Sequence, residues 1–353
     1  MNSEKQAYKT KPLPTVFFGG RGAEHEISLL GAVRFLSEAR RLGKEYRAVY
    51  IDKSADMYLY TEDPSEIPTL CADEYRRMTP TFPIRLCGRS GLYTEEGILP
   101  ISVAILLLHG DYGEDGKIQG LVDSAGIRFV GADTFAGAVA SDKAFSKAIA
   151  EHLGVPVLPW CVIYKGKDIK CEVEAFAERV GYPVFVKPAR LGSSVGASQA
   201  ENEGELIRAI EGAFSVADKV ILEPALADKR ELECAYYSVF DKTLIAPPGE
   251  VDTSGRFYDY GLKYSGDGTV GVYPRASVSD EVSERIVGYT KLLSSEMGIS
   301  HLSRFDYFLL PDGCVYFNEV NTFPGFTSTS LYSRMLDSCG VSFEKFLEDL
   351  FAL

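Results

Sequence analysis

Two aromatic and apolar segments near the C-terminus, residues 304–310 and 315–320, are separated by the sequence Pro311-Asp312-Gly313. Proline, aspartate and glycine are typical of tight turns, so the two segments predict a β-hairpin. If residues 311–314 form the loop, Leu310 faces Val315 on the neighbouring strand. This register determines which polar side chains of the two strands lie together.

Two pairs of polar side chains meet in this register, because Asp306 lies opposite Glu319 and Arg304 lies opposite Asn321. All four share one face, since side chains alternate between the two faces of a strand. Two carboxylates directly opposed across a sheet repel each other, and a cation between them removes the repulsion. Carboxylate and amide oxygens suit Mg²⁺ or Mn²⁺ rather than zinc. We therefore predict a metal site here; the alternative is a solvated charged face.

The composition limits the class of protein. A chain of 353 residues is long enough for two or three domains. Its formal charge of −13 argues against nucleic acid and anionic membranes as partners, although it does not exclude nucleotides. The seven cysteines contain no C-x-x-C pair. The N-terminus lacks the apolar core of a signal peptide. The longest apolar run, residues 101–108, is too short to span a bilayer. We expect a soluble cytoplasmic protein.

The N-terminal part alternates between strand and helix patterns, which predicts a parallel sheet covered by helices. Glycine-rich loops follow two of the strands, at residues 19–22 and 109–116, and ligands of such sheets bind at that edge. An insertion rich in proline and charge, residues 58–97, is expected to extend the domain surface. The expected strands are residues 15–18, 47–51, 101–108 and 127–130, and the expected helices are 27–41 and a segment ending near 125.

The remaining chain reads as further α/β units. A long helix over residues 134–153 leads into a junction at 154–159, and the pattern becomes predominantly β from residue 232. Further expected strands are residues 161–164, 184–187, 219–223 and 234–240, and further expected helices are 172–180, 203–214, 281–297 and 343–351.

A loop of small residues follows the strand that ends at Lys187. Residues 188–196 contain Gly192-Ser193-Ser194-Val195-Gly196, in which backbone N–H groups can approach an anion closely and hydroxyls add donors. It is not a Walker A loop, and Gly19-Gly20-Arg21-Gly22 does not fit the dinucleotide fingerprint. Taken alone, the loop could be a plain flexible hairpin. Together with the upstream lysine and the downstream metal face, it favours phosphate binding.

Several short segments with candidate binding residues occur along the chain in the order that a known protein family shows. The chain resembles the ATP-grasp superfamily and, within it, the D-alanine–D-alanine ligase family. The segments that carry the resemblance are residues 18–28, 108–120 (LHGDYGEDGKIQG), 141–143 (SDK), 185–196, 257–264, 304–306 and 317–330 (FNEVNTFPGFTSTS). The resemblance implies an α/β, three-domain ATP-grasp fold, in which an N-terminal Rossmann-like parallel-sheet domain precedes two α+β lobes that sandwich ATP. The expected boundaries are residues 1–131, 132–224 and 225–353.

The resemblance also implies residues that bind ATP and metal. Lys143 and Lys187 would hold the phosphates, and the Ser193-Ser194 loop would close over them. The family's lid corresponds to residues 252–268, from which Lys263 would reach the γ-phosphate. The implied adenosine contacts are Glu223, Glu231, the carbonyl of Pro224 and the amide of Leu226, and the implied ligands of two Mg²⁺ ions, or Mn²⁺, are Asp306, Glu319 and Asn321.

For the amino-acid substrates, the resemblance implies that Glu24 binds the ammonium of the first D-alanine. The alternative for Glu24 is an ordinary acid in the first turn of a helix. His109 would lie beside the substrate, although a histidine satisfied within the core is the common alternative. Ser193 and Tyr264 would complete a hydrogen-bonded set with Glu24.

The resemblance assigns the second half of the reaction to other groups. Arg304 and the N–H of Gly325 would stabilise an oxyanion, while Ser330 and the Leu331 amide would receive the carboxylate of the second D-alanine.

The implied function is ATP-dependent synthesis of D-alanyl-D-alanine through an acyl phosphate, for peptidoglycan precursors, by a cytoplasmic homodimer. Retention of Lys263 and Tyr264 favours an amino-acid acceptor over D-lactate, and leaves D-serine open. Two further functions stay open from the sequence: an ATP-grasp ligase acting on longer peptides, and a nucleotide-binding regulatory protein without turnover.

Overall fold

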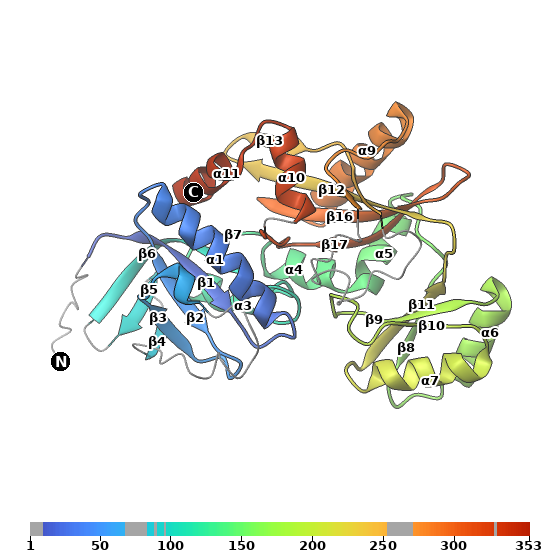
Figure 1. The fold of residues 1–353 in the computed structure, drawn as a ribbon. Helices are drawn as coiled ribbons and strands as arrows, with labels where there is room; N and C mark the ends of the chain where they lie inside the picture. The colour runs from blue at the N-terminus through green and yellow to red at the C-terminus, as the bar shows by residue number, and fades with distance from the viewer. Residues whose placement is uncertain (1–9, 68–82, 88–89, 95–96, 253–270, 328–329) are drawn as a thin grey trace.

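The computed structural model describes residues 10–67, 83–87, 90–94, 97–252, 271–327 and 330–353 (Figure 1). The strands of this part of the chain form a seven-stranded, a four-stranded and a six-stranded sheet. The mixed α/β class expected from the sequence is confirmed. None of the described helices combines the length and apolar character needed to cross a membrane.

The N-terminal sheet has a parallel centre. β1 lies between β2 and β6 and runs parallel to both, and β7 runs parallel to β6, as the alternating pattern predicted. Helix α1 buries one stripe of side chains, among them Leu29 and Phe35, against this sheet. The elements are β1 Leu13–Gly19, α1 His25–Arg41, β2 Arg47–Ile51, β3 Met57–Tyr60, η1 Pro64–Glu66, β4 Pro83–Cys87, β5 Gly91–Thr94, β6 Gly97–Leu107, α3 Lys117–Ser124 and β7 Phe129–Val130.

The predicted insertion is part of the sheet in its described portion. β3, β4 and β5 are antiparallel to their neighbours, and β5 pairs with the first half of β6. For this reason β6 begins at Gly97 rather than at residue 101. Strand pairing between distant segments, which periodicity does not reveal, explains the difference.

The central sheet is antiparallel, with the order β10-β9-β11-β8. Helices α6 and α7 cover one face through buried apolar residues such as Phe176 and Ile210. They lie on the side of this sheet away from β16 and β17 (Figure 1). The elements are β8 Cys161–Tyr164, α6 Lys170–Val180, β9 Val184–Pro188, β10 Ser198–Ala200, α7 Glu203–Phe214 and β11 Lys219–Pro224.

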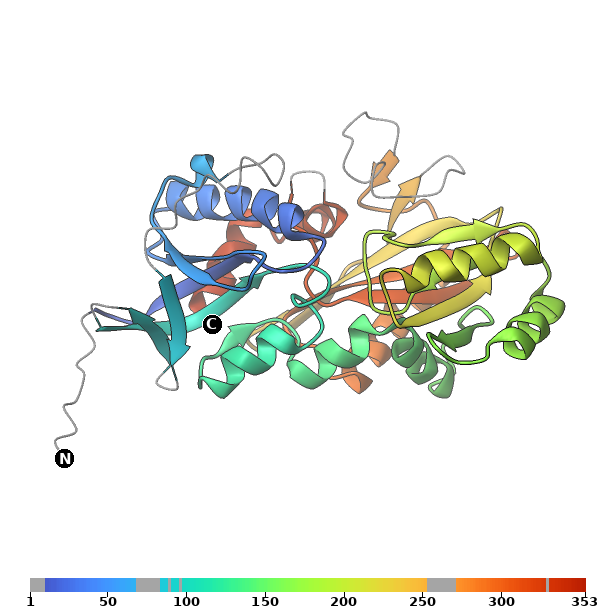
Figure 2. The ribbon, with the colours of Figure 1, turned by 90° about the horizontal axis from the view of Figure 1, so that it is seen from below.

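The C-terminal sheet is also antiparallel, with the order β15-β14-β12-β16-β17 and β13 paired to β12. Figure 2 shows from below how β12, β16 and β17 extend past the central sheet. The elements are β12 Arg230–Val239, β13 Lys242–Ile245, β14 Gly249–Asp252, β15 Gly271–Tyr273, α9 Asp280–Glu296, β16 Leu302–Leu309, β17 Val315–Asn321, α10 Leu331–Ser338 and α11 Phe343–Ala352.

The single helix predicted over residues 134–153 is wrong. Two helices, α4 (Thr134–Ser141) and α5 (Lys143–His152), meet at Asp142, whose extended backbone has φ −90° and ψ 104°. Its side chain accepts hydrogen bonds from the N–H groups of Ala144 and Phe145 and so caps α5. Both helices contribute to the hydrophobic core of the C-terminal sheet, although the expected boundaries assign them to the central lobe.

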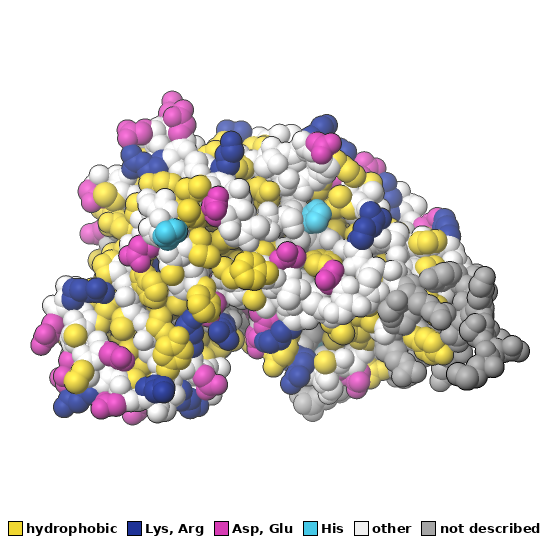
Figure 3. Space-filling model, turned by 180° about the vertical axis from the view of Figure 1, so that it is seen from behind, with side chains coloured by type: hydrophobic (Ala, Val, Ile, Leu, Met, Phe, Trp, Pro, Cys, Tyr) yellow, Lys and Arg dark blue, Asp and Glu magenta, His cyan; other side chains and the backbone are white. Residues whose placement is uncertain are grey.

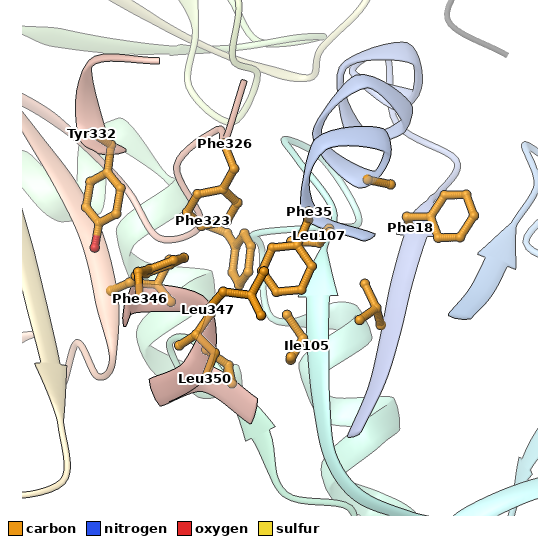
Figure 4. Packing of buried hydrophobic residues seen from close by; sticks show 14 of the residues in the cluster. Phe18, Phe35, Ile105, Leu107, Phe323, Phe326, Tyr332, Phe346, Leu347 and Leu350 are labelled. Carbon is orange, nitrogen blue, oxygen red and sulfur yellow. The ribbon is translucent and has the colours of Figure 1, made fainter. Parts of the chain in front are cut away.

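A further hydrophobic core joins the N-terminal domain to the C-terminal helices (Figure 4). Phe35 of α1 contacts Phe326, and Leu347 and Leu350 of α11 belong to the same buried cluster. Phe323 and Phe326 are 2% and 1% exposed, so the segment between β17 and α10 is anchored at both residues. Phenylalanine burial of this kind stabilises a loop by about 1.5–3 kcal/mol per side chain.

Charged side chains are mixed over the surface seen from behind (Figure 3). On this face, Lys and Arg side chains of the described residues are interspersed with Asp and Glu and form no continuous basic patch. This distribution agrees with the negative net charge.

Candidate functional site

A cleft with a cavity volume of about 340 Å³ lies where the three sheets meet. Parts of the N-terminal domain, the central sheet and the C-terminal sheet all line it. The residues expected from the sequence that line it are Glu24, His109, Lys143, Lys187, Ser193, Ser194, Glu223, Pro224, Leu226, Glu231, Arg304, Asp306, Glu319, Asn321, Gly325, Ser330 and Leu331. Lys263 and Tyr264 lie outside the described residues, so their roles stay predictions.

The β16–β17 hairpin has the predicted register at the site. Asp306 pairs with Glu319 and Arg304 pairs with Asn321. Near the turn the prediction is wrong, because Leu309 rather than Leu310 faces Val315. The register shifts between Asp306 and Tyr307, which leaves Asn318 as the extra residue of a β-bulge.

The predicted metal face carries one more carboxylate than the sequence suggested. Glu233 of β12 lies beside Asp306 of β16 in the sheet, and Asp306 lies beside Glu319 of β17. The three carboxylates therefore form a row across three neighbouring strands. Two positively charged side chains contact this row of carboxylates. Both oxygens of Asp306 accept from Arg304, at 2.7 Å each, and the Lys143 Nζ lies 3.0 Å from a Glu319 oxygen.

The oxygen donors fit a hard divalent cation. The Asn321 amide lies 3.1 Å from Asp306, next to the carboxylate row. Within the described residues, no group of three or more His, Cys, Asp and Glu side chains is arranged to hold a metal ion, and the Asn321 amide adds an oxygen donor of another kind beside Asp306 and Glu319. Oxygen atoms with no thiol or imidazole among them suit Mg²⁺. Asp306, Glu319 and Asn321 are therefore the side chains that could hold it.

Two lysines that the sequence predicts to bind phosphates line the cleft. Lys143 begins α5, where its N–H donates to the Ala189 carbonyl at 2.8 Å and its Nζ donates to the Leu191 carbonyl at 2.8 Å. Lys187 is the last residue but one of β9, and its Nζ lies 2.6 Å from Glu223 and 3.0 Å from the Asn318 side-chain oxygen. Both ammonium groups are thus held toward the cleft by partners on other elements.

The loop between β9 and β10 is folded back by unusual backbone angles. Ser193, Ser194 and Gly196 have φ values of 49°, 58° and 71°. Non-glycine residues rarely adopt such angles, and they persist where the surrounding structure imposes them. Ser193 Oγ donates a hydrogen bond to Glu24, which connects the loop to the N-terminal domain. The loop thus closes a hairpin between two antiparallel strands, β9 and β10, and contacts the N-terminal domain through Glu24.

Glu24 occupies the N-cap position of α1 but makes no capping hydrogen bond with its side chain. Its carboxylate lies instead in a slot between Gly110 and Gly192, where an added Cβ at Gly110 would overlap it and one at Gly192 would lie 2.8 Å away. The ordinary first-turn acid is thus not the arrangement found. A carboxylate presented into the cleft between two glycines suits an ammonium group.

His109 and Glu114 lie beside Glu24. The His109 Nδ1 is 3.0 Å from the Phe323 carbonyl oxygen, and burial lowers the pKa of this imidazole. Glu114, to which the sequence had given no role, accepts hydrogen bonds from the N–H groups of Gly110 and Phe323 at 2.9 and 2.8 Å. Burial and then the charge of Glu24 raise the pKa of Glu114 to about 8, against the two N–H donors. In the sequence, the glycine-rich segment GEDG, which contains Glu114, was the feature that could have pointed to this residue.

This raised pKa makes stability depend on pH. Because the folded pKa exceeds the unfolded value of 4.5, the native state binds more protons between about pH 4.5 and 8. We expect the unfolding free energy of the wild type to fall, relative to Glu114→Gln, as pH rises through this window, by at most about 1.4 kcal/mol per pH unit. Chemical denaturation at several pH values measures the difference. A pH-independent difference, like that expected for the exposed control Glu281→Gln, would contradict it.

The segment after β17 forms the far end of the cleft. Gly325 lies next to Ser330, whose Oγ would be 3.3 Å from an added Cβ. Ser330 precedes α10 and makes no capping hydrogen bond with its side chain, and its Oγ lies 2.8 Å from Thr327 Oγ1. Arg34 of α1 donates to the Phe326 carbonyl at 2.7 Å and also to Thr327. A helix N-terminus held in this way can receive a carboxylate.

Glu223, an expected adenosine contact, lines the cleft and is also paired with two lysines. This carboxylate is 2% exposed and lies between the ammonium groups of Lys147 and Lys187, at 2.7 and 2.6 Å. Glu223 therefore fixes the positions of two lysines, and its expected contact with the adenosine stays a prediction. Pro224, Leu226 and Glu231 line the cleft at the end of β11 and the start of β12.

Family models decide which family these features represent. The model described as D-ala D-ala ligase N-terminus matches residues 14–132, and the model described as D-ala D-ala ligase C-terminus matches residues 149–352. The chain belongs to the D-alanine–D-alanine ligase family. It is thus a ligase, and members of this family use ATP.

Relatives of this family match nearly the whole chain. The D-alanine–D-alanine ligase of Streptococcus thermophilus is 34% identical over 342 residues, covering 96% of this chain and 94% of the relative. The D-alanine–D-alanine ligase of Thermoanaerobacter pseudethanolicus is 34% identical over 346 residues, covering 96% and 95%.

Two solved structures of this family have the same fold. The VanG D-Ala:D-Ser ligase from Enterococcus faecalis has a TM-score of 0.85 at 30% identity, covering 98% of this chain and 99% of that structure. The D-alanyl-alanine synthetase A from Vibrio cholerae has a TM-score of 0.83 at 30% identity, covering 97% and 98%. The three-part architecture expected from the resemblance agrees with both.

Proposed function

We propose that this chain uses ATP to join two D-alanine molecules into D-alanyl-D-alanine, with release of ADP and phosphate. One observation carries the proposal. In a single cleft, the Glu24 slot, the two lysines at the ends of β9 and α5, and the carboxylate face of β16–β17 lie together on a chain of the D-alanine–D-alanine ligase family. An amino-acid site beside a phosphate site is what activation of a carboxylate by ATP requires.

In the first step, a carboxylate oxygen of D-alanine attacks the γ-phosphorus of ATP, and the bond from this phosphorus to ADP breaks. Lys143 and Lys187 hold the phosphates, and the Ser193-Ser194 loop covers them. Glu24 binds the ammonium of the first D-alanine, which fixes its carboxylate near the phosphates. Positioning of this kind supplies much of the rate in phosphoryl transfer.

Mg²⁺ held by Asp306, Glu319 and Asn321 would neutralise charge on the phosphates. Two ions are expected from the family, and Mn²⁺ has the same ligand preferences. On the adenosine side, Glu223, Glu231, the carbonyl of Pro224 and the amide of Leu226 bind the nucleoside. The missing N–H of Pro224 is no obstacle, because its assigned role needs only the acceptor.

In the second step, the amine of the second D-alanine attacks the acyl carbon, phosphate leaves, and the amine loses a proton. Arg304 and the N–H of Gly325 stabilise the oxyanion of the tetrahedral intermediate. Ser330 and the Leu331 N–H, at the start of α10, receive the carboxylate of this second substrate. The expected lid, residues 252–268, would exclude water from the acyl phosphate, while Lys263 would reach the γ-phosphate and Tyr264 would complete the hydrogen-bonded set with Ser193 and Glu24.

A D-serine acceptor is the second candidate, and one observation favours it. The VanG D-Ala:D-Ser ligase from Enterococcus faecalis has the same fold at a TM-score of 0.85. One additional hydroxyl changes the acceptor little, so the same residues would serve. We also propose that the protein is a cytoplasmic homodimer and that its product enters peptidoglycan precursor synthesis, as the family relationship suggests.

Phosphate release with ATP and Mg²⁺ tests the proposal. D-Alanine alone would be compared with D-alanine plus D-serine or D-lactate, and each product identified by mass. D-Alanyl-D-alanine as the main product is the expected result. If a mixed dipeptide or depsipeptide were the main product, only the identity of the second substrate would change. Phosphate release that does not depend on D-alanine would contradict the proposal, and the roles of Glu24 and Ser330 would be the first to be rejected.

A further inference from the structure

Lys147 is a fully buried lysine that no part of the proposed reaction uses. It lies on the inner face of α5 and is 0% exposed. A buried ammonium group is unfavourable unless it is paired and hydrogen-bonded. Its Nζ lies 2.7 Å from a Glu223 oxygen and 3.3 Å from the Phe317 carbonyl oxygen. Lys147 therefore spans from the C-terminal core to the end of β11 in the central sheet.

The pair continues through Glu223 into the cleft. The other Glu223 oxygen lies 2.6 Å from the Lys187 Nζ, which also donates to the Asn318 side-chain oxygen at 3.0 Å. This buried network links α5, β11, β9 and β17. Glu223 and Lys187 line the cleft, whereas Lys147 is not among the lining residues. Any effect of Lys147 on a ligand must therefore pass through its partners.

The charges of the network explain what Lys147 contributes. Burial opposes the charge of Glu223, but Lys147 and Lys187 outweigh it and lower the pKa of this carboxyl to about 2. Burial also lowers the pKa of Lys147 to about 8, and the Glu223 carboxylate opposes that shift. Without Lys147, one anion would face one cation, and Lys187 would be held in a neutral pair. With Lys147, Glu223 is shared between two cations.

We propose that Lys147 is a positioning residue for ATP, which holds Glu223 and the backbone of Phe317 so that Lys187 points its charge at the phosphates. The inference rests on the proposed role of Lys187 in ATP binding. It does not require Lys147 to contact substrate. Because Phe317 precedes the Asn318 bulge, the same contact supports the hairpin that bears Asp306 and Glu319.

Lys147→Met tests this inference, since methionine keeps the length and apolar stem of the side chain. We expect the KM for ATP and the Kd for ADP to rise roughly 10-fold or more, because one partner of a buried pair is removed. The KM for D-alanine should change by less than about twofold, since Glu24 and Ser330 are not in the network. Asp349→Asn is the matched control. Asp349 is a buried acid that accepts from the Tyr237 hydroxyl, away from the cleft.

The pH dependence separates positioning from simple stability. The charged groups facing Glu223 are Lys147 from α5 and Lys187 from β9, and Glu319 of β17 acts on Lys147. Loss of Lys147 removes one of the two cations that lower the pKa of the Glu223 carboxyl, so this pKa rises, and ADP affinity should vary with pH in acidic solution more in the variant than in the wild type. A structural role alone would not change this profile.

A double variant, Lys147→Met with Glu223→Gln, keeps the inference testable if the single variant does not fold. It removes the Lys147 and Glu223 charges together, so that Lys187 is the charged side chain left in the network, with the Asn318 side-chain oxygen as its remaining partner. Its ADP affinity should still be below that of the wild type, yet the loss should be smaller than the two single losses multiplied. Multiplicative losses, or wild-type ADP affinity in Lys147→Met, would overturn the inference. If the wild type itself released no D-alanine-dependent phosphate, the proposed function would fail instead.

Discussion

Asp306→Ala is expected to reduce D-alanine-dependent phosphate release to background, by about 1,000-fold or more, which corresponds to the several kcal/mol that metal charge supplies. Asp306 lies in the middle of the carboxylate row, between Glu233 and Glu319, and its oxygens also accept from Arg304 and Asn321. Alanine removes both the oxygens and the partner of the guanidinium. Phosphate release measures the effect, and the thermal unfolding midpoint shows that the fold is retained.

Asp241→Ala is the control for the loss of one carboxylate. Asp241 is exposed between β12 and β13, so its replacement should leave activity within about twofold and stability within about 0.5 kcal/mol. Asp306→Asn keeps the shape of the side chain while weakening it as a metal ligand, and should shift the Mg²⁺ concentration needed for half-maximal activity upward. Substantial activity in Asp306→Ala, or unchanged Mg²⁺ dependence in Asp306→Asn, would show that Asp306 is not a metal ligand.

Arg304→Lys is expected to lower kcat roughly 100-fold although the charge is kept. The guanidinium donates through Nε and Nη2 to the two oxygens of Asp306, and its Nε is also 3.3 Å from Glu233. A lysine provides one compact charge on a flexible stem and cannot reproduce two parallel donors. The oxyanion then loses a donor held at a defined position, which affects the transition state more than substrate binding.

Steady-state kinetics distinguish this effect from a binding defect, because kcat should fall while the KM values for ATP and D-alanine change little. Arg285→Lys is the matched control. Arg285 pairs with Glu281 and donates to Gly313 at the turn of the same hairpin, outside the cleft. If Arg304→Lys retained the kcat of Arg285→Lys, Arg304 would not be an oxyanion donor.

Much of the hairpin could be predicted because its signals are local. Alternation of side chains and the Pro311-Asp312-Gly313 turn place Asp306 opposite Glu319, and the structure has this pairing. Near the turn the predicted register is wrong by one residue, and the bulge at Asn318, which no turn or periodicity signal marks, offsets this error before Asp306 and Arg304. Asn318 nevertheless bears on the site, because its side chain accepts from Lys187.

Other residues of the site were missed because their partners are distant in the chain. Glu233 reads as one polar residue among several at the start of a strand, and only pairing of β12 with β16 puts it beside Asp306. Lys147 reads as an ordinary polar position of an amphipathic helix, since a long side chain on a helix is commonly exposed. Its burial is decided by where α5 packs on the C-terminal sheet.

The sequence by itself determined the fold class, the helices and strands with strong periodicity, and the order of the motifs that identify the ligase family. Strand β8 (Cys161–Tyr164) and helix α7 (Glu203–Phe214) have the predicted bounds, because their patterns depend on neighbours along the chain. Only the tertiary structure decided the break at Asp142, the slot that holds Glu24 and the lysines around Glu223. These features depend on free energies of burial and charge pairing between segments brought together by folding, and no local pattern encodes them.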